Sequence, residues 1–256
     1  IQDINKSIYY FTLAANQNHK KSQYYLGIIY LNRDIEKSIY YFTLASDQND
    51  IESHLNLGII YLTGKFVPQN IKKAIHYYTL AADQNHVLAQ YNLGRMYFEG
   101  IITQLDVNKA IHYLTLAADQ KLSNAQTYLG SIYINNDYIP TDINKGLHYL
   151  SLAADQNNAL AQFYLGRLYI TGKVVTQNIN KAIYYYTLAA SQNYVKAQFE
   201  LGCTYVNQIF IKQDINKSIY YLSLAAEQNH IHSQYNLGIM YLDDQYSKRN
   251  INKSIY

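Results

Sequence analysis

Residues 73–97 read KAIHYYTLAADQNHVLAQYNLGRMY, and copies of this segment follow one another along almost the whole chain. A lysine that precedes a small residue recurs once after 31 residues and then six times after 36, at Lys6, Lys37, Lys73, Lys109, Lys145, Lys181, Lys217 and Lys253. A Leu-Gly pair keeps the same rhythm, with its glycine at Gly27, Gly58, Gly94, Gly130, Gly166, Gly202 and Gly238. Two markers in one register predict a repeat array, which grows by stacking units rather than by enclosing one centre.

The composition argues against several classes of protein. Apolar residues make up 49% of the 256 residues, which is enough for a continuous core. The formal net charge of +3 is close to balanced and argues against a dedicated polyanion binder. Cys203 is the single cysteine, so no internal disulfide framework can form. No apolar run approaches the ~18 residues of a membrane span.

The segment that contains the lysine is predicted to be a helix with one buried face. Counted from the lysine, apolar or small residues fall at offsets 1, 4, 5, 8 and 9, which is helical spacing. Three residues before the lysine stand natural N-caps at Asp3, Asn70, Asp106, Asp142, Asn178, Asp214 and Asn250. Left-handed asparagines are expected to end this helix at Asn18, Asn49, Asn85, Asn157, Asn193 and Asn229. Lys121 takes that place once, where the left-handed conformation should cost about 1–2 kcal/mol.

A second helix is predicted around each Leu-Gly pair. In the quoted segment its buried side is Ala89, Leu93, Met96 and Tyr97, and Gly94 allows a close approach to the partner helix. Isolated helices shorter than about 12–15 residues are marginal in water, so the stability of each unit must come from stacking on its neighbours. The sequence therefore predicts an all-α solenoid of about seven antiparallel helix pairs.

The repeated residues resemble the Sel-1-like repeat family, which is related to tetratricopeptide repeats. The pattern of that family is carried here by Ala161, Leu165-Gly166, Tyr169, Gly172, Lys181-Ala182 and Ala189-Ala190. The chain departs from it where asparagine replaces the closing glycine, and its one cysteine excludes the subtype with a disulfide in every repeat. The resemblance implies a right-handed superhelix formed by a single solenoid over residues 1–256, with repeats that start near residues 20, 51, 87, 123, 159, 195 and 231. It also implies a scaffold or adaptor without a cofactor, not a catalyst.

The binding surface is predicted by comparing the repeats with one another. Three positions vary among otherwise matched copies: five residues before the leucine of the Leu-Gly pair, two before it and two after it. They share one helical face, which by resemblance lines the concave groove of the solenoid. The candidate partner-binding residues are Tyr24, Leu88, Tyr91, Arg95, Asn124, Ser131, Leu160, Phe163, Arg167, Lys196, Phe199, His232 and Tyr235.

The predicted partner is a protein or peptide. Tyr91, Phe163 and Phe199 would serve as aromatic anchors. Arg95 and Arg167, two repeats apart, would orient an acidic or carbonyl-rich segment. Two alternatives stay open: a regulatory or targeting segment of a larger enzyme such as a kinase, and a binder of single-stranded nucleic acid through exposed tyrosines.

No catalytic or metal site is predicted. His76, His112 and His148 form a row, but equivalent positions of stacked helices lie at least ~8–10 Å apart, whereas zinc holds its ligands at about 2.0–2.1 Å. Gly64-Lys65 and Gly172-Lys173 faintly resemble the end of a phosphate loop, yet the rest of that motif is absent, which favours plain link residues.

The chain ends and the charges give three further expectations. Residue 1 lies just before the lysine of a repeat and residue 256 lies inside a helix, so we expect a fragment of a longer chain, with end-to-end self-association through the truncated C-terminal repeat. Sugar on the sequons at Asn5, Asn216 and Asn252 would crowd the stack, which favours a cytoplasmic location. The lysine near the start of its helix and the acid near its end both oppose the helix dipole, so we expect these charges to pair between adjacent repeats.

Overall fold

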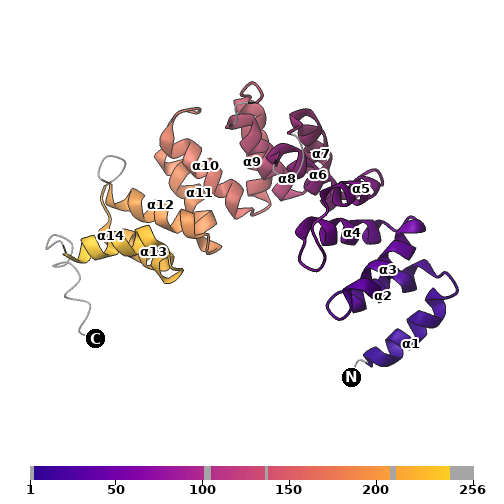
Figure 1. The fold of residues 1–256 in the computed structure, drawn as a ribbon. Helices are drawn as coiled ribbons and strands as arrows, with labels where there is room; N and C mark the ends of the chain where they lie inside the picture. The colour runs from indigo at the N-terminus through magenta and orange to yellow at the C-terminus, as the bar shows by residue number, and fades with distance from the viewer. Residues whose placement is uncertain (1–2, 101–104, 136–137, 208–211, 243–256) are drawn as a thin grey trace. The chain divides into compact units, whose positions relative to one another are not determined.

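The computed structural model describes residues 3–100, 105–135, 138–207 and 212–242 (Figure 1). These residues form helices joined by turns and links, without a strand among them. The helices are α1 (Ile4–Ala15), α2 (Lys20–Tyr30), α3 (Ile35–Asp47), α4 (Ile51–Thr63), α5 (Ile71–Ala82), α6 (Val87–Glu99), α7 (Val107–Asp119), α8 (Ser123–Ile134), α9 (Ile143–Asp155), α10 (Ala159–Thr171), α11 (Ile179–Ser191), α12 (Val195–Val206), α13 (Ile215–Glu227) and α14 (Ile231–Leu242). The chain forms two compact units, Ile1–Ala125 and Gln126–Tyr256.

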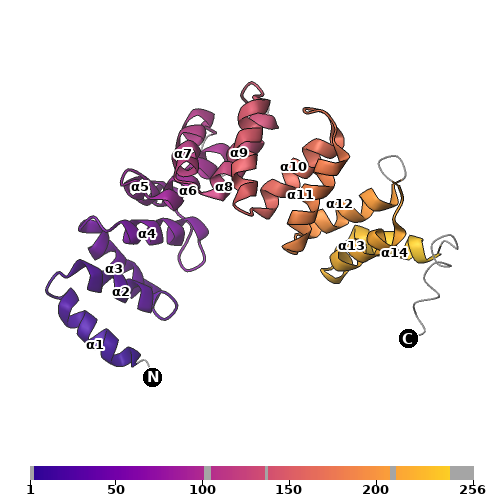
Figure 2. The ribbon, with the colours of Figure 1, turned by 180° about the vertical axis from the view of Figure 1, so that it is seen from behind.

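Within each unit a helix pairs with the next helix along the chain, as α4 does with α5 and α10 with α11 (Figure 2). The even-numbered helices carry the Leu-Gly pair, and we call them the Leu-Gly helices. The odd-numbered helices carry the lysine, and we call them the lysine helices. Stacked helix pairs, with no strand in the described part of the chain, confirm the predicted all-α solenoid architecture.

The lysine helices begin and end as predicted. The N-cap carboxylate of Asp106 accepts a hydrogen bond of 3.0 Å from the amide of Lys109. Each described member of the predicted set of N-caps accepts the equivalent hydrogen bond in its own helix. Asp34 caps α3 in the same way. Asn250 lies outside the described residues. The six asparagines and Lys121 all have φ between 59° and 64°. The backbone amides of Asn85 and His86 donate to the carbonyls of Ala82 and Ala81, which closes the end of α5.

The glycine of every Leu-Gly pair from Gly27 to Gly202 lets the two helices of its repeat approach closely. A Cβ atom on Gly94 would lie 2.5 Å from Cγ of Leu114 in α7. One on Gly166 would lie 2.5 Å from the Tyr186 ring in α11. Only a residue without a side chain fits there, because protein interiors are already close-packed. The predicted close approach of Gly94 is confirmed.

The tyrosines form a regular stack that the sequence did not reveal. In the repeats from residue 20 to residue 230, a tyrosine near the end of the Leu-Gly helix stacks on one in the lysine helix, as Tyr97 does on Tyr113 with 6.0 Å between ring centroids and 6° between planes. The same pair forms in the repeat with the shorter link, where Tyr30 and Tyr41 stack at 5.9 Å and 9°. The five missing residues are therefore absorbed by the link and leave this contact unchanged. Among the described residues, these stacked pairs are Tyr30–Tyr41, Tyr61–Tyr77, Tyr97–Tyr113, Tyr133–Tyr149, Tyr169–Tyr185 and Tyr205–Tyr221.

The predicted pairing of charges between repeats is wrong. The ammonium of Lys109 lies 3.5 Å from the carboxylate of Asp106, the cap of its own helix, and 5.2 Å above the ring of Tyr97. The same arrangement recurs at Lys37, Lys145 and Lys217. Lys73 and Lys181 lie over their tyrosines beside asparagine caps. The acids at the helix ends are exposed, and no ion pair of theirs occurs among the described residues. The cap carboxylate at i−3 compensates the lysine because it lies at the same helix end.

Buried amide side chains join successive repeats, in a ladder that sequence reasoning missed. Gln162 is fully buried; its Nε2 donates to the carbonyl of Ala154 in the preceding repeat at 3.2 Å, and its Oε1 accepts from Gln192 at 2.8 Å. The equivalent glutamine pairs are Gln23–Gln48, Gln90–Gln120, Gln126–Gln156 and Gln198–Gln228. We call this set the amide ladder. Its signal in the sequence is a glutamine three residues before every leucine of the Leu-Gly pairs but one, where His54 stands.

Candidate functional site: the Leu-Gly helix face

The three variable positions of the Leu-Gly helices define what we call the Leu-Gly face. The position five residues before the leucine is exposed in every copy: Lys21, Glu52, Leu88, Asn124, Leu160, Lys196 and His232. The neighbouring alanine or serine and the ladder residue are buried in most copies. The side chain at this position is therefore not needed for packing within the repeat.

The position two residues before the leucine supports packing more than it offers a surface. Phe163 is 5% exposed, and its ring lies 5.3 Å from that of Tyr194 and 5.9 Å from that of Tyr186. Such a residue cannot act as an exposed anchor, which corrects the role expected for it. Tyr24, Tyr91 and Phe199 are half-buried, and Tyr235 is exposed.

The position two residues after the leucine holds two arginines in different states. The guanidinium of Arg95 donates to Oε1 of Glu99 from Nη2 at 2.8 Å and from Nε at 3.0 Å, and it lies over the ring of Tyr91. The guanidinium of Arg167 lies 5.9 Å from the centre of the Phe163 ring, and the residue one turn later is Thr171 rather than an acid. Arg95 is thus neutralised by its own helix, whereas Arg167 makes no ion pair within the described residues.

A cavity in the second unit gathers two of the predicted residues, Ser131 on α8 and Arg167 on α10. Its volume is about 220 Å³. The other lining residues are Asn135, Leu150, Tyr164, Leu168, Thr171, Lys173 and Val174. The Gly172-Lys173 pair was noticed in the sequence for its likeness to a phosphate loop. It was interpreted as plain link residues, so Lys173 was not predicted to line a cavity. The left-handed backbone of Gly172, φ 63°, turns the chain there at the end of α10.

Two titratable groups on α12, the next helix pair's Leu-Gly helix, have raised pKa values. Burial raises the pKa of the Glu200 carboxyl on α12, and the positive charge of Arg167 partly opposes the rise. Burial raises the pKa of the Cys203 thiol to about 11, with a smaller contribution from Glu200. A protonated thiol is a poor nucleophile, so Cys203 is a packing residue, as expected.

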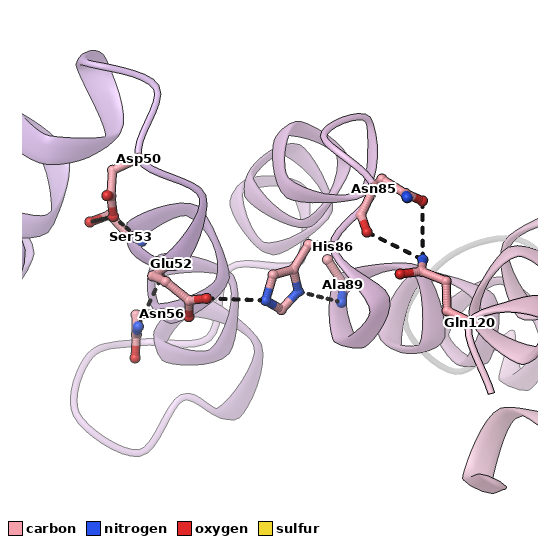
Figure 3. A network of polar contacts seen from close by, with 8 residues as sticks. All are labelled: Asp50, Glu52, Ser53, Asn56, Asn85, His86, Ala89 and Gln120. Carbon is pink, nitrogen blue, oxygen red and sulfur yellow. Dashed lines mark hydrogen bonds and ion pairs between the residues drawn. The ribbon is translucent and has the colours of Figure 1, made fainter. Parts of the chain in front are cut away.

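The first unit carries a polar network that includes Glu52 of the Leu-Gly face (Figure 3). Nε2 of His86 lies 3.5 Å from Oε1 of Glu52, and Nδ1 of His86 accepts from the amide of Ala89 at 3.4 Å. The ring therefore caps α6 and contacts the exposed position of α4. On its other side, the Gln120 amide of the ladder donates to the side chain and the carbonyl of Asn85.

The described histidines do not form a metal site. His76, His112 and His148 are exposed, and each lies against the tyrosine that follows it. In the part of the chain that the structure describes, no three His, Cys, Asp or Glu side chains are grouped as metal ligands. None of the described helices is long and apolar enough to cross a bilayer.

Comparisons with known proteins agree with this geometry. The family model "Sel1 repeat" matches residues 1–19, 20–50, 51–86, 87–122, 123–158, 159–194, 195–230 and 231–256. A Sel1 repeat protein from Oxalobacter formigenes is similar at 29% identity and a TM-score of 0.70, over 91% of this chain and 69% of that one.

Two more distant structures show the fold alone. A protective antigen of uropathogenic Escherichia coli has 23% identity and a TM-score of 0.55, over 94% of this chain and 60% of its own. An immunity protein from Pseudomonas aeruginosa has 22% identity and a TM-score of 0.52, over 81% of this chain and 80% of its own. A comparison with curated protein sequences gives no match. Since the family model covers the whole chain, this protein belongs to the Sel1 repeat family.

Proposed function

We propose that the chain is a non-enzymatic scaffold that binds a protein or peptide through its Leu-Gly face. Sel1 repeat proteins are in general protein-interaction scaffolds. The observation that carries the proposal is the contrast between the repeated framework and the exposed position five residues before the leucine. This position holds lysine twice, leucine twice and a different residue in each of the other repeats. A side chain that the framework does not need for packing can change from repeat to repeat, and such exposed positions are where binding residues commonly lie.

The arrangement of the lysines argues against the nucleic-acid alternative. Binding of a nucleic acid depends on cations that neutralise its phosphates. Most of the repeated lysines already lie beside an aspartate cap, which reduces the charge that they present. No observation favours the alternative of a segment that regulates a larger enzyme.

Site-directed photo-crosslinking tests the proposal. A photoreactive amino acid is placed at Leu160 or Lys196 on the Leu-Gly face, and at His148 or Tyr184 on the lysine helices, all of which are exposed. We expect a defined protein crosslinked from the first two positions and not from the other two. Crosslinking from the lysine helices alone would contradict the proposed surface.

Two expectations remain predictions. Asn5 and Asn216 are exposed, Asn252 lies outside the described residues, and the cytoplasmic location is untested. The last described helix, α14, exposes Ile231, Tyr235 and Leu242, as expected of an uncovered face. The remainder of that repeat lies outside the described residues, and end-to-end association through it is likewise untested.

A further inference from the structure

We propose that the cavity lined by α8, α9 and α10 binds a carboxylate carried on a short apolar stem. A peptide offers this group as a glutamate side chain or as its C-terminal residue. The proposal rests on the proposed function, since it names the chemistry by which one part of the Leu-Gly face recognises a peptide.

The charge of the cavity selects an anion. Arg167 and Lys173 are the charged residues of the lining, and both are cationic. Neither makes an ion pair within the described residues, unlike Arg95, which holds Glu99. Glu200 is close enough for the charge of Arg167 to act on its pKa, but it makes no ion pair with Arg167 among the described residues and does not line the cavity. A guanidinium that retains its donors binds a carboxylate through two parallel hydrogen bonds.

The polar groups beside the cations add few further donors. The hydroxyl of Ser131 donates to the carbonyl of Tyr128 at 2.7 Å, and that of Thr171 donates to the carbonyl of Arg167 at 2.8 Å. These hydroxyl hydrogens are therefore already used. The side chains of Arg167, Lys173 and Asn135 line the cavity and can donate to the oxygens of a carboxylate.

The rest of the lining suits a carbon stem. Leu150 is 1% exposed and Leu168 is 8% exposed, and with Val174 they form the apolar part of the wall. A fully hydrated anion such as phosphate would lose water against these groups without gaining hydrogen bonds. A carboxylate on methylene groups places its charge at the cations and its stem on the leucines.

The size of the cavity suits one residue rather than a whole ligand. Its volume of about 220 Å³ lies below the roughly 300–1,000 Å³ of sites for drug-sized molecules. The cavity is therefore a pocket for one side chain or chain end, and the rest of the peptide would lie on the surrounding face.

The test follows amide chemical shifts of the intact chain by NMR, with four small probes. Two carry the proposed group, N-acetyl-glutamate methylamide and N-acetyl-leucine. The others are N-acetyl-leucine amide, which is uncharged, and inorganic phosphate. We expect both carboxylates to shift the amides of Ser131, Thr171 and Lys173 with millimolar affinity, and the amide and phosphate to shift them at least fivefold more weakly.

Matched variants locate the effect. The double variant Arg167→Gln with Lys173→Gln is expected to weaken carboxylate binding at least fivefold. Arg95→Gln occupies the same place in another repeat and is expected to leave it unchanged, because its guanidinium is held by Glu99. Circular dichroism confirms that each variant is folded, as expected for changes at surface positions.

Three results would overturn the inference: no shifts at these amides, equal shifts with the uncharged amide or phosphate, or undiminished binding in the double variant. These outcomes are separate from those of the proposed function. A partner crosslinked to Leu160, together with no carboxylate binding, would support the scaffold proposal and refute the carboxylate pocket. Carboxylate binding without any crosslinked partner would support the pocket and count against the scaffold proposal.

Discussion

Nδ1 of His54 lies 3.3 Å from Nε2 of Gln84, at the place where most other repeats pair two glutamines. Nε2 of His54 lies 3.2 Å from the carbonyl oxygen of Ser46. A carbonyl only accepts, so Nε2 carries the hydrogen and the neutral Nδ1 accepts from the amide of Gln84. The amide ladder therefore depends on a neutral imidazole at this one position.

The first prediction concerns pH. Burial lowers the pKa of His54, with a further lowering by His76, against smaller opposite effects from the Ser46 carbonyl, Asp50 and Asp47. The unfolded chain takes up the proton at the ordinary pKa of about 6.5, before the folded chain does. The stabilising contribution is therefore complete above that pH and is lost as the pH falls towards the lowered pKa.

Thermal unfolding at pH 7.5 and pH 5.5 measures this effect. The His54→Gln variant restores an amide pair, so we expect its melting temperature to fall less on acidification than that of the wild type. His76→Gln removes an exposed histidine of the same unit and should keep most of the wild-type difference. An unchanged pH response in His54→Gln would show that the ladder histidine does not titrate in this range.

The second prediction concerns the glycines of the Leu-Gly pairs. In Gly94→Ala the new methyl group meets Cγ of Leu114 at 2.5 Å and its backbone nitrogen at 3.0 Å. Overpacking of this kind costs about 1–3 kcal/mol, against a gain in helix propensity of roughly 1 kcal/mol. Because the backbone itself is in contact, we expect a net loss of stability in chemical denaturation.

Gly238→Ala is the matched control for that change. Among the described residues, no heavy atom lies within 4 Å of a Cβ on Gly238, so only the gain in helix propensity applies. Its denaturation midpoint should stay the same or rise. If Gly94→Ala also raised the midpoint, the close approach of α6 and α7 would not limit the side chain there.

The third prediction concerns Lys121, whose φ is 64° where the other repeats have asparagine. Asparagine tolerates the left-handed region better than lysine, so Lys121→Asn should stabilise the chain by about 1 kcal/mol. The reciprocal change Asn157→Lys should destabilise it by a similar amount. Equilibrium denaturation in urea measures both, and two shifts of the same sign would refute the backbone explanation.

Much of the fold could be predicted from the sequence because the repeat imposes it. Aspartate and asparagine caps, left-handed asparagines and a glycine at helical spacing are local signals, and each found its expected place. The amide ladder, the stacked tyrosines and the pairing of each lysine with its own cap depend on contacts that spacing alone does not reveal.

The candidate site was predicted less well. The exposed position of each Leu-Gly helix followed from variation among the repeats, and Leu160 and Lys196 are indeed exposed. The state of each arginine depended on the residue one turn later, Glu99 in one case and Thr171 in the other, which a comparison of single positions overlooked. Phe163 was predicted to be an anchor because it is aromatic and its position varies, but its ring is buried between neighbouring helices.

The affinity of the crosslinked partner tests the scaffold proposal most directly. Titration calorimetry would compare the wild type with two double variants of the second unit, Leu160→Glu with Lys196→Glu on the Leu-Gly face and His148→Glu with Tyr184→Glu on the lysine helices. We predict that the first pair weakens binding at least tenfold at an unchanged melting temperature, and that the second changes it less than twofold. Equal affinity in both, or a loss confined to the second pair, would contradict a function carried by the Leu-Gly face.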